Sequence, residues 1–401
     1  MSDTRNDPST LIRRMAFPQG RSRALVTPMQ PSVVYSIDSP DMLDAVYEGR
    51  EEGYTYSREG HPNAEMLARR IDAMEHAEGG IVVGSGMAAI TAVMLGLCSA
   101  GDHVIGGDQL YGKSLKLMRQ DLPRLGIATD LVDPCDWRNV EAAIRPETKL
   151  ILVEVVSNPT IRIADIAGIA RLAKARGVKL VIDNTFTTPR GFQAYANGAD
   201  VIVHSVTKLL AGHSDAMLGY AVARDPADRA AIEAASASFG LTASPFDCWL
   251  AERGLYTFDL RYDRCEENAA TLAAHLATLP GVTKVLYPGR ADHPEAARAN
   301  ELLAGRNGNM VSFEVAGGRA AANALVLAMP DLPFAPTLGD VGTTLSHPCT
   351  SSHRGLTHEA RAAIGITEGF FRVSVGVEDG AALKAEFSAG VAAAAKAAQG
   401  G

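Results

Sequence analysis

The stretch DVIVHSVTKLLAGHSDAMLG at residues 200–219 is the one around which this chain of 401 residues is organised. The apolar run 201–203 is typical of a buried strand, and Lys208 follows it closely. Burial disfavours the charged form of a lysine and lowers its pKa, and a neutral lysine amine forms a Schiff base with an aldehyde. The nearby hydroxyls of Ser205 and Thr207 suit a phosphate group. The alternative is a solvated lysine on a surface turn, as most lysines are, and the rest of the sequence decides between the two.

Continuous apolar runs alternate with helical segments in the part of the chain that leads to this stretch. We expect strands at 81–83, 103–105, 128–132, 150–153, 180–182 and 201–203, and helices at 64–74, 87–98, 114–125, 137–144 and 166–176. Asn63 is the expected N-cap of the first helix. Apolar strands that alternate with helices predict an α/β fold with a mostly parallel sheet covered on both faces. In such a sheet the functional groups collect at the carboxyl ends of the strands.

The regions on either side of this α/β pattern have a different character. Beyond about residue 223 there are long helical stretches at 225–238 and 244–275, and then a mixed region with elements at 310–315, 320–329 and 371–375. This mixed region predicts a smaller C-terminal α+β domain. Residues 1 to about 60 show little regular pattern and read as an arm without a fold of its own. We therefore divide the chain into an arm at 1–62, a large domain at 63–255 and a C-terminal domain at 256–401.

Composition excludes several classes of function. The net charge of −8 argues against nucleic acid or an anionic membrane as the main partner. The N-terminal sequence lacks the apolar core of a signal peptide, and no segment is long and apolar enough to span a membrane. Five scattered cysteines without a C-x-x-C pair fit a reducing cytoplasm. His347, Cys349, His353 and His358 match no closed zinc pattern, so we expect no metal site.

One alternative comes from the sequence GSGMAA at residues 84–89, which matches the dinucleotide fingerprint G-x-G-x-x-A after a predicted strand. Asp108 lies about twenty residues further on, near the place of a ribose-binding acid. This pattern would make the protein an NAD(P)-dependent oxidoreductase. A glycine loop that opens a helix binds any phosphate through its free N–H groups, however. The fingerprint alone therefore indicates a phosphate rather than a dinucleotide.

The ends of the neighbouring predicted strands favour a different cofactor. Asp183 follows the strand at 180–182, Asn158 comes after the strand at 150–153, and Tyr111 comes after the strand at 103–105. With the glycine loop and the lysine, these strand ends offer a phosphate site, an aromatic ring, an amide, a carboxylate and an amine. Pyridoxal phosphate requires such a set, because its protonated pyridine ring withdraws electrons from the substrate Cα and needs a carboxylate partner.

The motifs also occur in a distinctive joint arrangement. They are YSR at Tyr56, SGMAA at Ser85, YG at Tyr111, DNTF at Asp183, HSVTK at His204 and GHSD at Gly212, followed by RGLYTFDLR at Arg253, SHP at Ser346 and FRVSVGVED at Phe371. Over nearly the whole chain this arrangement resembles the Cys/Met-metabolism family of pyridoxal-phosphate-dependent enzymes. The resemblance implies a fold-type I PLP-dependent transferase fold. It also implies β- or γ-elimination or γ-replacement on cystathionine-like or O-acylhomoserine-like amino acids. An aminotransferase would use the same cofactor and fold, and it stays open as an alternative.

The resemblance further implies roles for individual residues. Lys208 would bind the cofactor aldehyde and move the proton at the substrate Cα, Asp183 would pair with the pyridine nitrogen, and Tyr111 would stack on the ring and take part in catalysis. Other implied cofactor contacts are Ser85, Gly86, Met87, Thr185, Ser205 and Thr207, and implied substrate contacts are Asn158, Thr343 and Arg372, the last as a clamp on the α-carboxylate. Tyr56 and Arg58 would reach the cofactor phosphate of the neighbouring subunit. The arm therefore implies a homodimer with shared sites, usually doubled into a tetramer.

The sequence departs from the family pattern in the part that bears on the substrate. Gly342 stands where cystathionine-handling members often have a glutamate that binds the distal amine, and Thr343 replaces the usual serine beside it. Loss of that carboxylate removes a partner for a second ammonium group, an effect of about 1–3 kcal/mol at a buried site. After Tyr111 and Gly112 come Lys113 and Ser114, where a Gly-Thr-like pair is common in the family. Lys113 either adds a positive charge near the pocket or points to water. The sequence does not choose between β and γ chemistry.

Overall fold

The computed structural model describes residues 20–400, and its larger part is built on a seven-stranded sheet. The strands lie in the order β1-β7-β6-β5-β4-β2-β3. Their bounds are β1 Ile81–Val83, β2 His103–Gly107, β3 Ala128–Val132, β4 Thr148–Glu154, β5 Lys179–Asp183, β6 Val201–His204 and β7 Gly219–Ala223. Strands β2 to β6 pair in parallel, and β7 runs antiparallel to its neighbours β1 and β6. The prediction of a mostly parallel sheet is confirmed.

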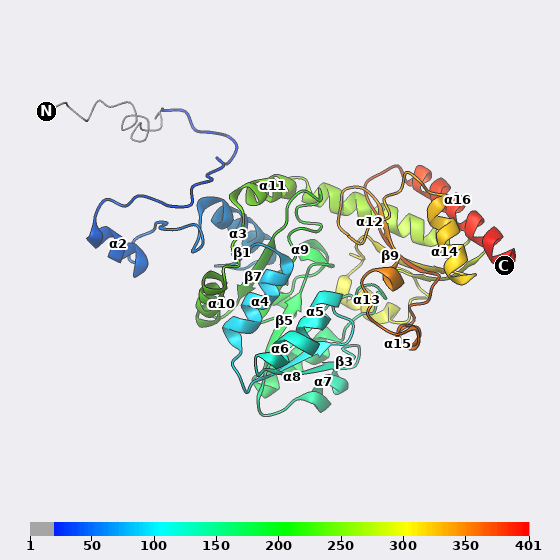
Figure 1. Ribbon diagram of the computed structural model, residues 1–401, viewed down its shortest axis with the longest axis horizontal. Coiled ribbons are helices and arrows are strands. Elements are labelled where there is room, and N and C mark those ends of the chain that lie inside the picture. The colour runs from blue at the N-terminus through cyan, green and yellow to red at the C-terminus, as the bar shows by residue number, and fades with distance from the viewer. Residues whose placement is uncertain (1–19, 401) are drawn as a thin grey trace.

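Helices cover both faces of this sheet (Figure 1). They are α3 Pro62–Glu75, α4 Gly86–Leu97, α5 Gly112–Lys116, α6 Leu122–Arg124, α7 Trp137–Ala143, α8 Ile166–Arg176, α9 Thr188–Gly191, α10 Pro226–Phe239 and α11 Pro245–Leu255, with a π-helical turn at Leu117–Asp121 between α5 and α6. Helix α4 packs against β6 and β7 together with α10, and α8 packs against β5. Ser85 caps α4, because its hydroxyl accepts the N–H of Ala88 at 3.0 Å.

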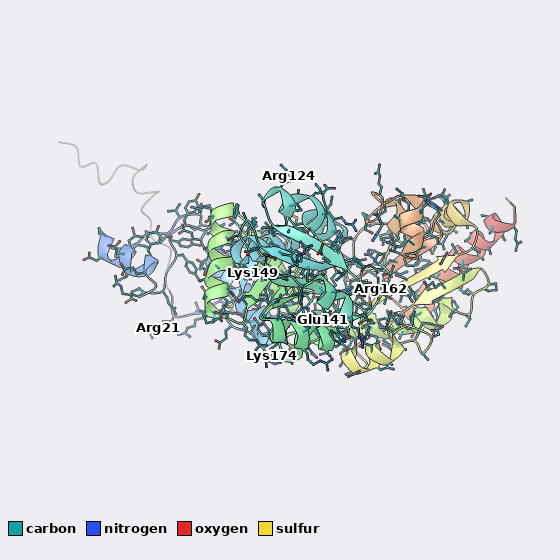
Figure 2. The ribbon with its side chains drawn as sticks, turned by 90° about the horizontal axis from the view of Figure 1, so that it is seen from below. Arg21, Arg124, Glu141, Lys149, Arg162 and Lys174 are labelled. Carbon is teal, nitrogen blue, oxygen red and sulfur yellow. The ribbon has the colours of Figure 1, made fainter. Side chains whose placement is uncertain are left out.

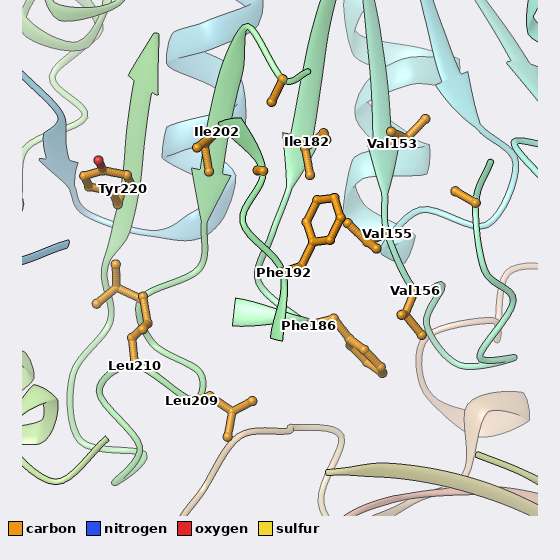
Figure 3. Packing of buried hydrophobic residues seen from close by; sticks show 14 of the residues in the cluster. Val153, Val155, Val156, Ile182, Phe186, Phe192, Ile202, Leu209, Leu210 and Tyr220 are labelled. Atoms are coloured by element: carbon orange, nitrogen blue, oxygen red, sulfur yellow. The ribbon is translucent and has the colours of Figure 1, made fainter. Parts of the chain in front are cut away.

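The central residues of the inner strands are apolar because each face of the sheet contributes to a separate buried cluster. Val203 of β6 belongs to the cluster beneath α4, whereas its neighbour Ile202 belongs to the cluster on the opposite face. Figure 3 shows this second cluster, in which Val153, Ile182, Ile202 and Tyr220 come from β4, β5, β6 and β7. Packing on both faces holds the strand ends at the spacing of a regular sheet, about 4.8 Å. Side chains that follow those ends are therefore positioned by a rigid frame.

A four-stranded antiparallel sheet forms the C-terminal part of the chain, in the order β10-β11-β9-β8. The elements are α12 Phe258–Leu276, β8 Val282–Leu286, α13 Ala296–Leu303, β9 Met310–Val315, α14 Gly318–Leu327, β10 Thr344–Ser346, α15 His358–Ala363, β11 Phe370–Ser374 and α16 Gly380–Gln399. Phe371 and Val373 of β11 point into a core shared with the helices. Alternation along the strand turns Arg372 to the other face. The expected smaller C-terminal α+β domain is confirmed.

Helix α12 leads from the large sheet to the small one (Figure 1). We propose the domain boundary just before this helix, at 255/256. The arm extends away from the body of the molecule and carries a helix that the sequence did not predict, α2 Pro40–Tyr47. Its first nineteen residues lie outside the described residues. The boundary at 62/63 falls within the first turn of α3 and stays a prediction.

Three expectations about single elements are wrong. The predicted helix 244–275 is two helices, because the chain breaks between α11 and α12. At this break Gly254 packs against the turn after Lys208, and a Cβ on Gly254 would lie 2.2 Å from the Ala211 oxygen. Strand β7 was missed because its small residues carry little hydrophobic pattern. His61, not Asn63, caps α3: its ring nitrogen accepts the Ala64 N–H at 3.1 Å.

The surface of the large domain is charged. Figure 2 shows side chains such as Arg124 and Lys174 on the outside of the domain, and both are exposed. Within residues 20–400, no helix has the combination of length and apolar composition that crossing a bilayer would require.

Candidate active site

The carboxyl ends of three neighbouring strands bring Glu154, Asp183 and His204 to one edge of the large sheet. Glu154 on β4 is the register partner of Asp183 on β5. The chain leaves β6 through a tight turn in which the N–H of Lys208 donates to the Ser205 carbonyl at 3.1 Å. Residues that the sequence places at separate strand ends therefore lie close together in space.

Lys208 is half-buried between the two sheets. Its Nζ donates to Oγ1 of Thr337 at 3.2 Å, a residue of the segment that leads into β10. Burial, and secondly the positive charge of Arg372, lower the pKa of Lys208 below its ordinary value. A larger fraction of the amine is therefore neutral at neutral pH than in a free lysine, which favours attack on an aldehyde.

A buried arginine holds the turn that carries Lys208. Arg261 on α12 donates to the carbonyl oxygens of Leu209 at 2.8 Å, Leu210 at 3.1 Å and Gly254 at 2.9 Å. The planar guanidinium group can reach three acceptors at once, whereas a lysine ammonium has no such fixed fork. Arg261 thus ties the lysine turn to the break between α11 and α12.

Replacing Arg261 with lysine is expected to lower the free energy of unfolding by about 1–3 kcal/mol, because buried carbonyl oxygens lose their donors. We also expect weaker cofactor retention, since the lysine turn loosens. Urea unfolding and cofactor titration of the variant measure the two effects. Arg264→Lys, on the same helix but more exposed, is the matched control, and equal behaviour of the two variants would contradict the assigned role of Arg261.

The glycine loop at the start of α4 lies against the lysine turn. A Cβ on Gly86 would lie 2.6 Å from Cβ of Ser205, so a larger residue here would push the two segments apart. The N–H groups of Gly86 and Met87, at the first two helical positions, have no partner within the helix. Together with the positive end of the helix dipole they form an anion site. The Ser205 backbone N–H donates to Oγ1 of Thr185 at 2.7 Å, whereas the Thr207 hydroxyl is already paired with the Leu218 backbone.

The two carboxyl groups at this sheet edge differ in their surroundings. Asp183 is partly open to the site, and its Oδ1 accepts the backbone N–H of Thr185 at 3.0 Å. Burial raises the pKa of Asp183, while hydrogen bonds from Thr185 and the nearby His204 act in the opposite direction. Glu154 is buried, and its Oε1 accepts the backbone N–H of Tyr111 at 2.7 Å. The Tyr111 side chain is 43% exposed, so its ring is free to stack on a bound group.

Arg372 is a buried cation without a carboxylate partner among the described residues. It is 5% exposed, its Nη1 donates to Oδ1 of Asn158 at 2.8 Å, and its Nη2 donates to the Thr337 carbonyl. Its Nε has no hydrogen-bond partner in residues 20–400. Burial lowers the pKa of Arg372 to about 10. An unpaired buried charge is costly, so the Arg372 guanidinium favours the binding of an anion. Its partner Thr337 also accepts a hydrogen bond from Lys208.

Three predicted site residues lie elsewhere or have other partners. Tyr56 and Arg58 line a cavity of about 520 Å³ between the arm, α3 and α10, and none of the residues around Lys208 lines it. The Arg58 guanidinium lies 5.5 Å from the centre of the Tyr56 ring. The Thr343 hydroxyl donates to Glu378 at 2.8 Å and accepts the Gly376 N–H at 2.9 Å. Its substrate contact stays a prediction.

The structure argues against a dinucleotide-binding site and against a metal site. In a dinucleotide-binding fold the glycine loop follows a strand near the switch point of the parallel sheet. Here β1 lies at the edge of the sheet, and the one strand of residues 20–400 that pairs with it is the antiparallel β7. His347, Cys349 and Glu368 place possible ligand atoms within 4.8 Å of one another. The Glu368 carboxylate, however, is already paired with Arg319 and Arg361. We therefore assign no metal to this cluster.

Sequence reasoning missed three residues that the structure joins to the site. Thr337 contacts both Lys208 and Arg372, Arg261 holds the lysine turn, and Glu154 contacts Tyr111. Arg261 ends the RGLYTFDLR motif and Thr337 precedes Gly342 by five positions, but no local pattern distinguishes them from a surface arginine or a solvated threonine. Their partners are distant in sequence, so only the folded chain identifies them.

The set of groups fits pyridoxal phosphate. The loop at Gly86 is a cradle that a Cβ would fill, Asp183 opens to the site from the sheet, and Lys208 supplies an amine of lowered pKa between them. The Nε of Arg372, which has no hydrogen-bond partner within residues 20–400, can donate a hydrogen bond to a substrate carboxylate.

Comparison with known proteins gives a consistent result. The profile of the family described as Cys/Met metabolism PLP-dependent enzyme matches residues 9–392. The chain is 36% identical to the L-methionine gamma-lyase of Pseudomonas putida, over 90% of this chain and 91% of that protein. It is 38% identical to the O-succinylhomoserine sulfhydrylase of Pseudomonas aeruginosa, over 87% and 86% of the two chains. The crystal structure of cystathionine gamma synthase from Xanthomonas oryzae superposes with a TM-score of 0.87 at 34% identity, covering 93% of this chain and 94% of that chain.

Proposed function

This chain belongs to the Cys/Met metabolism family of PLP-dependent enzymes, and from that premise we propose which residues carry its reaction and which substrates it takes. It is a PLP-dependent enzyme of the lyase and synthase type in sulfur amino acid metabolism, with the fold-type I architecture. The relatives include a lyase, a sulfhydrylase and a synthase at similar identity, so the choice among these reactions has to come from the site.

The proposed cofactor contacts follow from the groups around Lys208. Lys208 would hold the aldehyde covalently, Asp183 would pair with the pyridine nitrogen, and the N–H groups of Gly86 and Met87 would bind the phosphate. When bound, pyridoxal phosphate withdraws electrons from the substrate Cα. Once the substrate amine has displaced it from the aldehyde, the Lys208 amine would be free to accept and return the proton at the substrate Cα. Tyr111 would cover the ring from the open side.

The buried Arg372 is the single observation that carries the substrate assignment. Its guanidinium lies in the same site as Lys208, Asn158 and Thr337 orient it, and no carboxylate among residues 20–400 neutralises it. A two-pronged contact with the α-carboxylate would satisfy it. This contact fixes the Cα–H bond relative to Lys208, so proton removal can be stereospecific.

The segment from Thr337 to Thr343 supports a substrate with an uncharged or acylated side chain. Gly342 offers no carboxylate for a second ammonium group, and the Glu378 carboxylate nearby already accepts both the N–H and the hydroxyl of Thr343. We therefore propose methionine-like or O-acylhomoserine-like substrates ahead of cystathionine. An aminotransferase with the same cofactor is the second candidate.

A substrate panel tests this assignment. The PLP-loaded protein is given cystathionine, methionine, cysteine and O-acylhomoserines, with and without a thiol, and keto acid, sulfide and thioether products are measured. We expect turnover of methionine or an O-acylhomoserine to exceed that of cystathionine. Faster turnover of cystathionine would contradict the role given to Gly342. Transfer of the amino group to an added keto acid without loss of the side chain would identify an aminotransferase.

We further propose a cytoplasmic homodimer, doubled into a tetramer, in which Tyr56 and Arg58 complete the site of the neighbouring subunit. Two observations support this: the arm projects from the body, and Arg58 lies away from Lys208 of its own chain. All five cysteines are free, in keeping with a reducing compartment.

Shared sites make a specific prediction for mixed subunits. Arg58→Ala is expected to weaken cofactor binding, because a phosphate contact is lost across the interface. Chains carrying Arg58→Ala, refolded with chains carrying Lys208→Ala, are expected to recover up to about a quarter of the wild-type activity, since each mixed dimer contains one complete site. Each variant refolded alone is the control. Absence of recovery in mixtures shown to contain mixed dimers would contradict shared sites.

A further inference from the structure

A buried carboxyl group that the proposed function does not use lies beside Asp183. Glu154 is the last residue of β4, is 9% exposed, and is the register partner of Asp183 on β5. Residues in register on adjacent parallel strands point their side chains to the same face, about 4.8 Å apart. One oxygen of Glu154, Oε2, has no hydrogen-bond partner within residues 20–400.

Glu154 also joins two other parts of the site. Its Oε1 accepts the backbone N–H of Tyr111 at 2.7 Å, and the backbone N–H of Asn158 faces the same carboxyl group. Tyr111 precedes the first turn of α5, and Asn158 accepts a hydrogen bond from Arg372. A single side chain thus anchors the proposed ring-stacking residue and the partner of the substrate-binding arginine.

The neighbouring groups favour the negative charge on Asp183 over Glu154. Glu75 on α3 accepts a hydrogen bond from the Asn184 amide at 2.8 Å, and its Oε1 lies 2.5 Å from Nε2 of His204 on β6. Asp183 is stabilised by the Thr185 N–H and has the nearby His204. Glu154 is in no ion pair among the described residues, and it faces the carboxylate of Asp183.

Two carboxyl groups in such proximity do not both ionise readily. Burial, and secondly the negative charge of Asp183, raise the pKa of Glu154 well above its ordinary value. The N–H bond from Tyr111 acts in the opposite direction, but no cation among residues 20–400 pairs with Glu154 to offset its burial and the charge of Asp183.

We propose that Glu154 is a positioning residue: as a neutral carboxyl group it holds Tyr111 and Asn158 in place and leaves the negative charge beneath the cofactor ring on Asp183. The role in the loaded enzyme rests on the assignment of Asp183 to the pyridine nitrogen. The inference that Glu154 is protonated in the protein without cofactor does not depend on that assignment.

The first test uses the cofactor-free protein. A carboxyl group whose folded pKa is raised makes the protein less stable as the pH rises from the unfolded pKa towards the folded one, because the unfolded chain releases a proton that the native protein keeps. Glu154→Gln has the same shape but cannot ionise. Its urea midpoint is expected to fall less than that of the wild type as the pH rises from 5 to 8. Parallel pH dependences of the two proteins would overturn the neutral state of Glu154.

The second test concerns position. Glutamine at 154 keeps an oxygen for the Tyr111 N–H, whereas alanine does not. We expect Glu154→Gln to bind pyridoxal phosphate at least tenfold more tightly than Glu154→Ala, and to retain more of the visible circular dichroism of the bound cofactor. Equal loss in both variants would show that Glu154 acts through its charge and would overturn the proposal. If the alanine variant does not fold, the pH dependence of the glutamine variant still decides the protonation state.

Discussion

Replacing Lys208 with alanine is expected to lower turnover by at least about 10³-fold, because the change removes both the covalent attachment of the cofactor and the base that moves the Cα proton. Fold stability should change little, since within residues 20–400 the lysine amine has a single hydrogen bond, to Thr337. The measurements are steady-state rates, and peptide mapping after borohydride reduction of the wild type, which should find the cofactor on residue 208. Lys174→Ala, at an exposed lysine of α8, is the control. Reduced cofactor on a different lysine, or near-normal rates in the variant, would refute the assignment.

The second large effect is expected at Arg372. Arg372→Lys keeps a positive charge but loses the fork that contacts Asn158 and Thr337, and removing such a buried contact costs about 2–5 kcal/mol. We therefore expect kcat/KM to fall by about 10²- to 10³-fold, mainly through a higher KM. Arg354→Lys, at an exposed arginine, is the matched control. An unchanged KM for the amino acid would show that Arg372 does not bind the carboxylate.

Arg372→Met has an additional effect that the lysine variant lacks. The charge of Arg372 lowers the pKa of Lys208, so its removal should raise the pKa of that amine. A higher pKa leaves less neutral amine at a given pH. Capture of pyridoxal phosphate by the cofactor-free protein is therefore expected to require a higher pH in Arg372→Met than in Arg372→Lys. The pH dependence of the capture rate, followed by the visible absorbance, measures this shift.

The local parts of the fold were predictable from the sequence because they depend on neighbours a few residues apart. The strands β1 and β3 were predicted at their observed bounds, and the glycine loop opens α4 as expected. Two of the failures have one cause. Strand β7 and the break between α11 and α12 are decided by packing: a Cβ on Gly219 would lie 2.0 Å from the Ser85 oxygen, and Gly254 must approach the lysine turn.

By itself the sequence determined the kind of cofactor, because the residues with the required chemistry follow apolar runs and strand ends of a parallel sheet converge. Only the tertiary structure decided which groups act together. The hydrogen bond from Arg372 on β11 to Asn158 in the turn after β4 joins residues 214 positions apart, and Lys208 reaches Thr337 across 129 positions. The pairing of Glu154 with Asp183 likewise comes from strand register. Burial and proximity of this kind set the pKa values and the unpaired charge of the site, and both depend on the complete packing of the two domains.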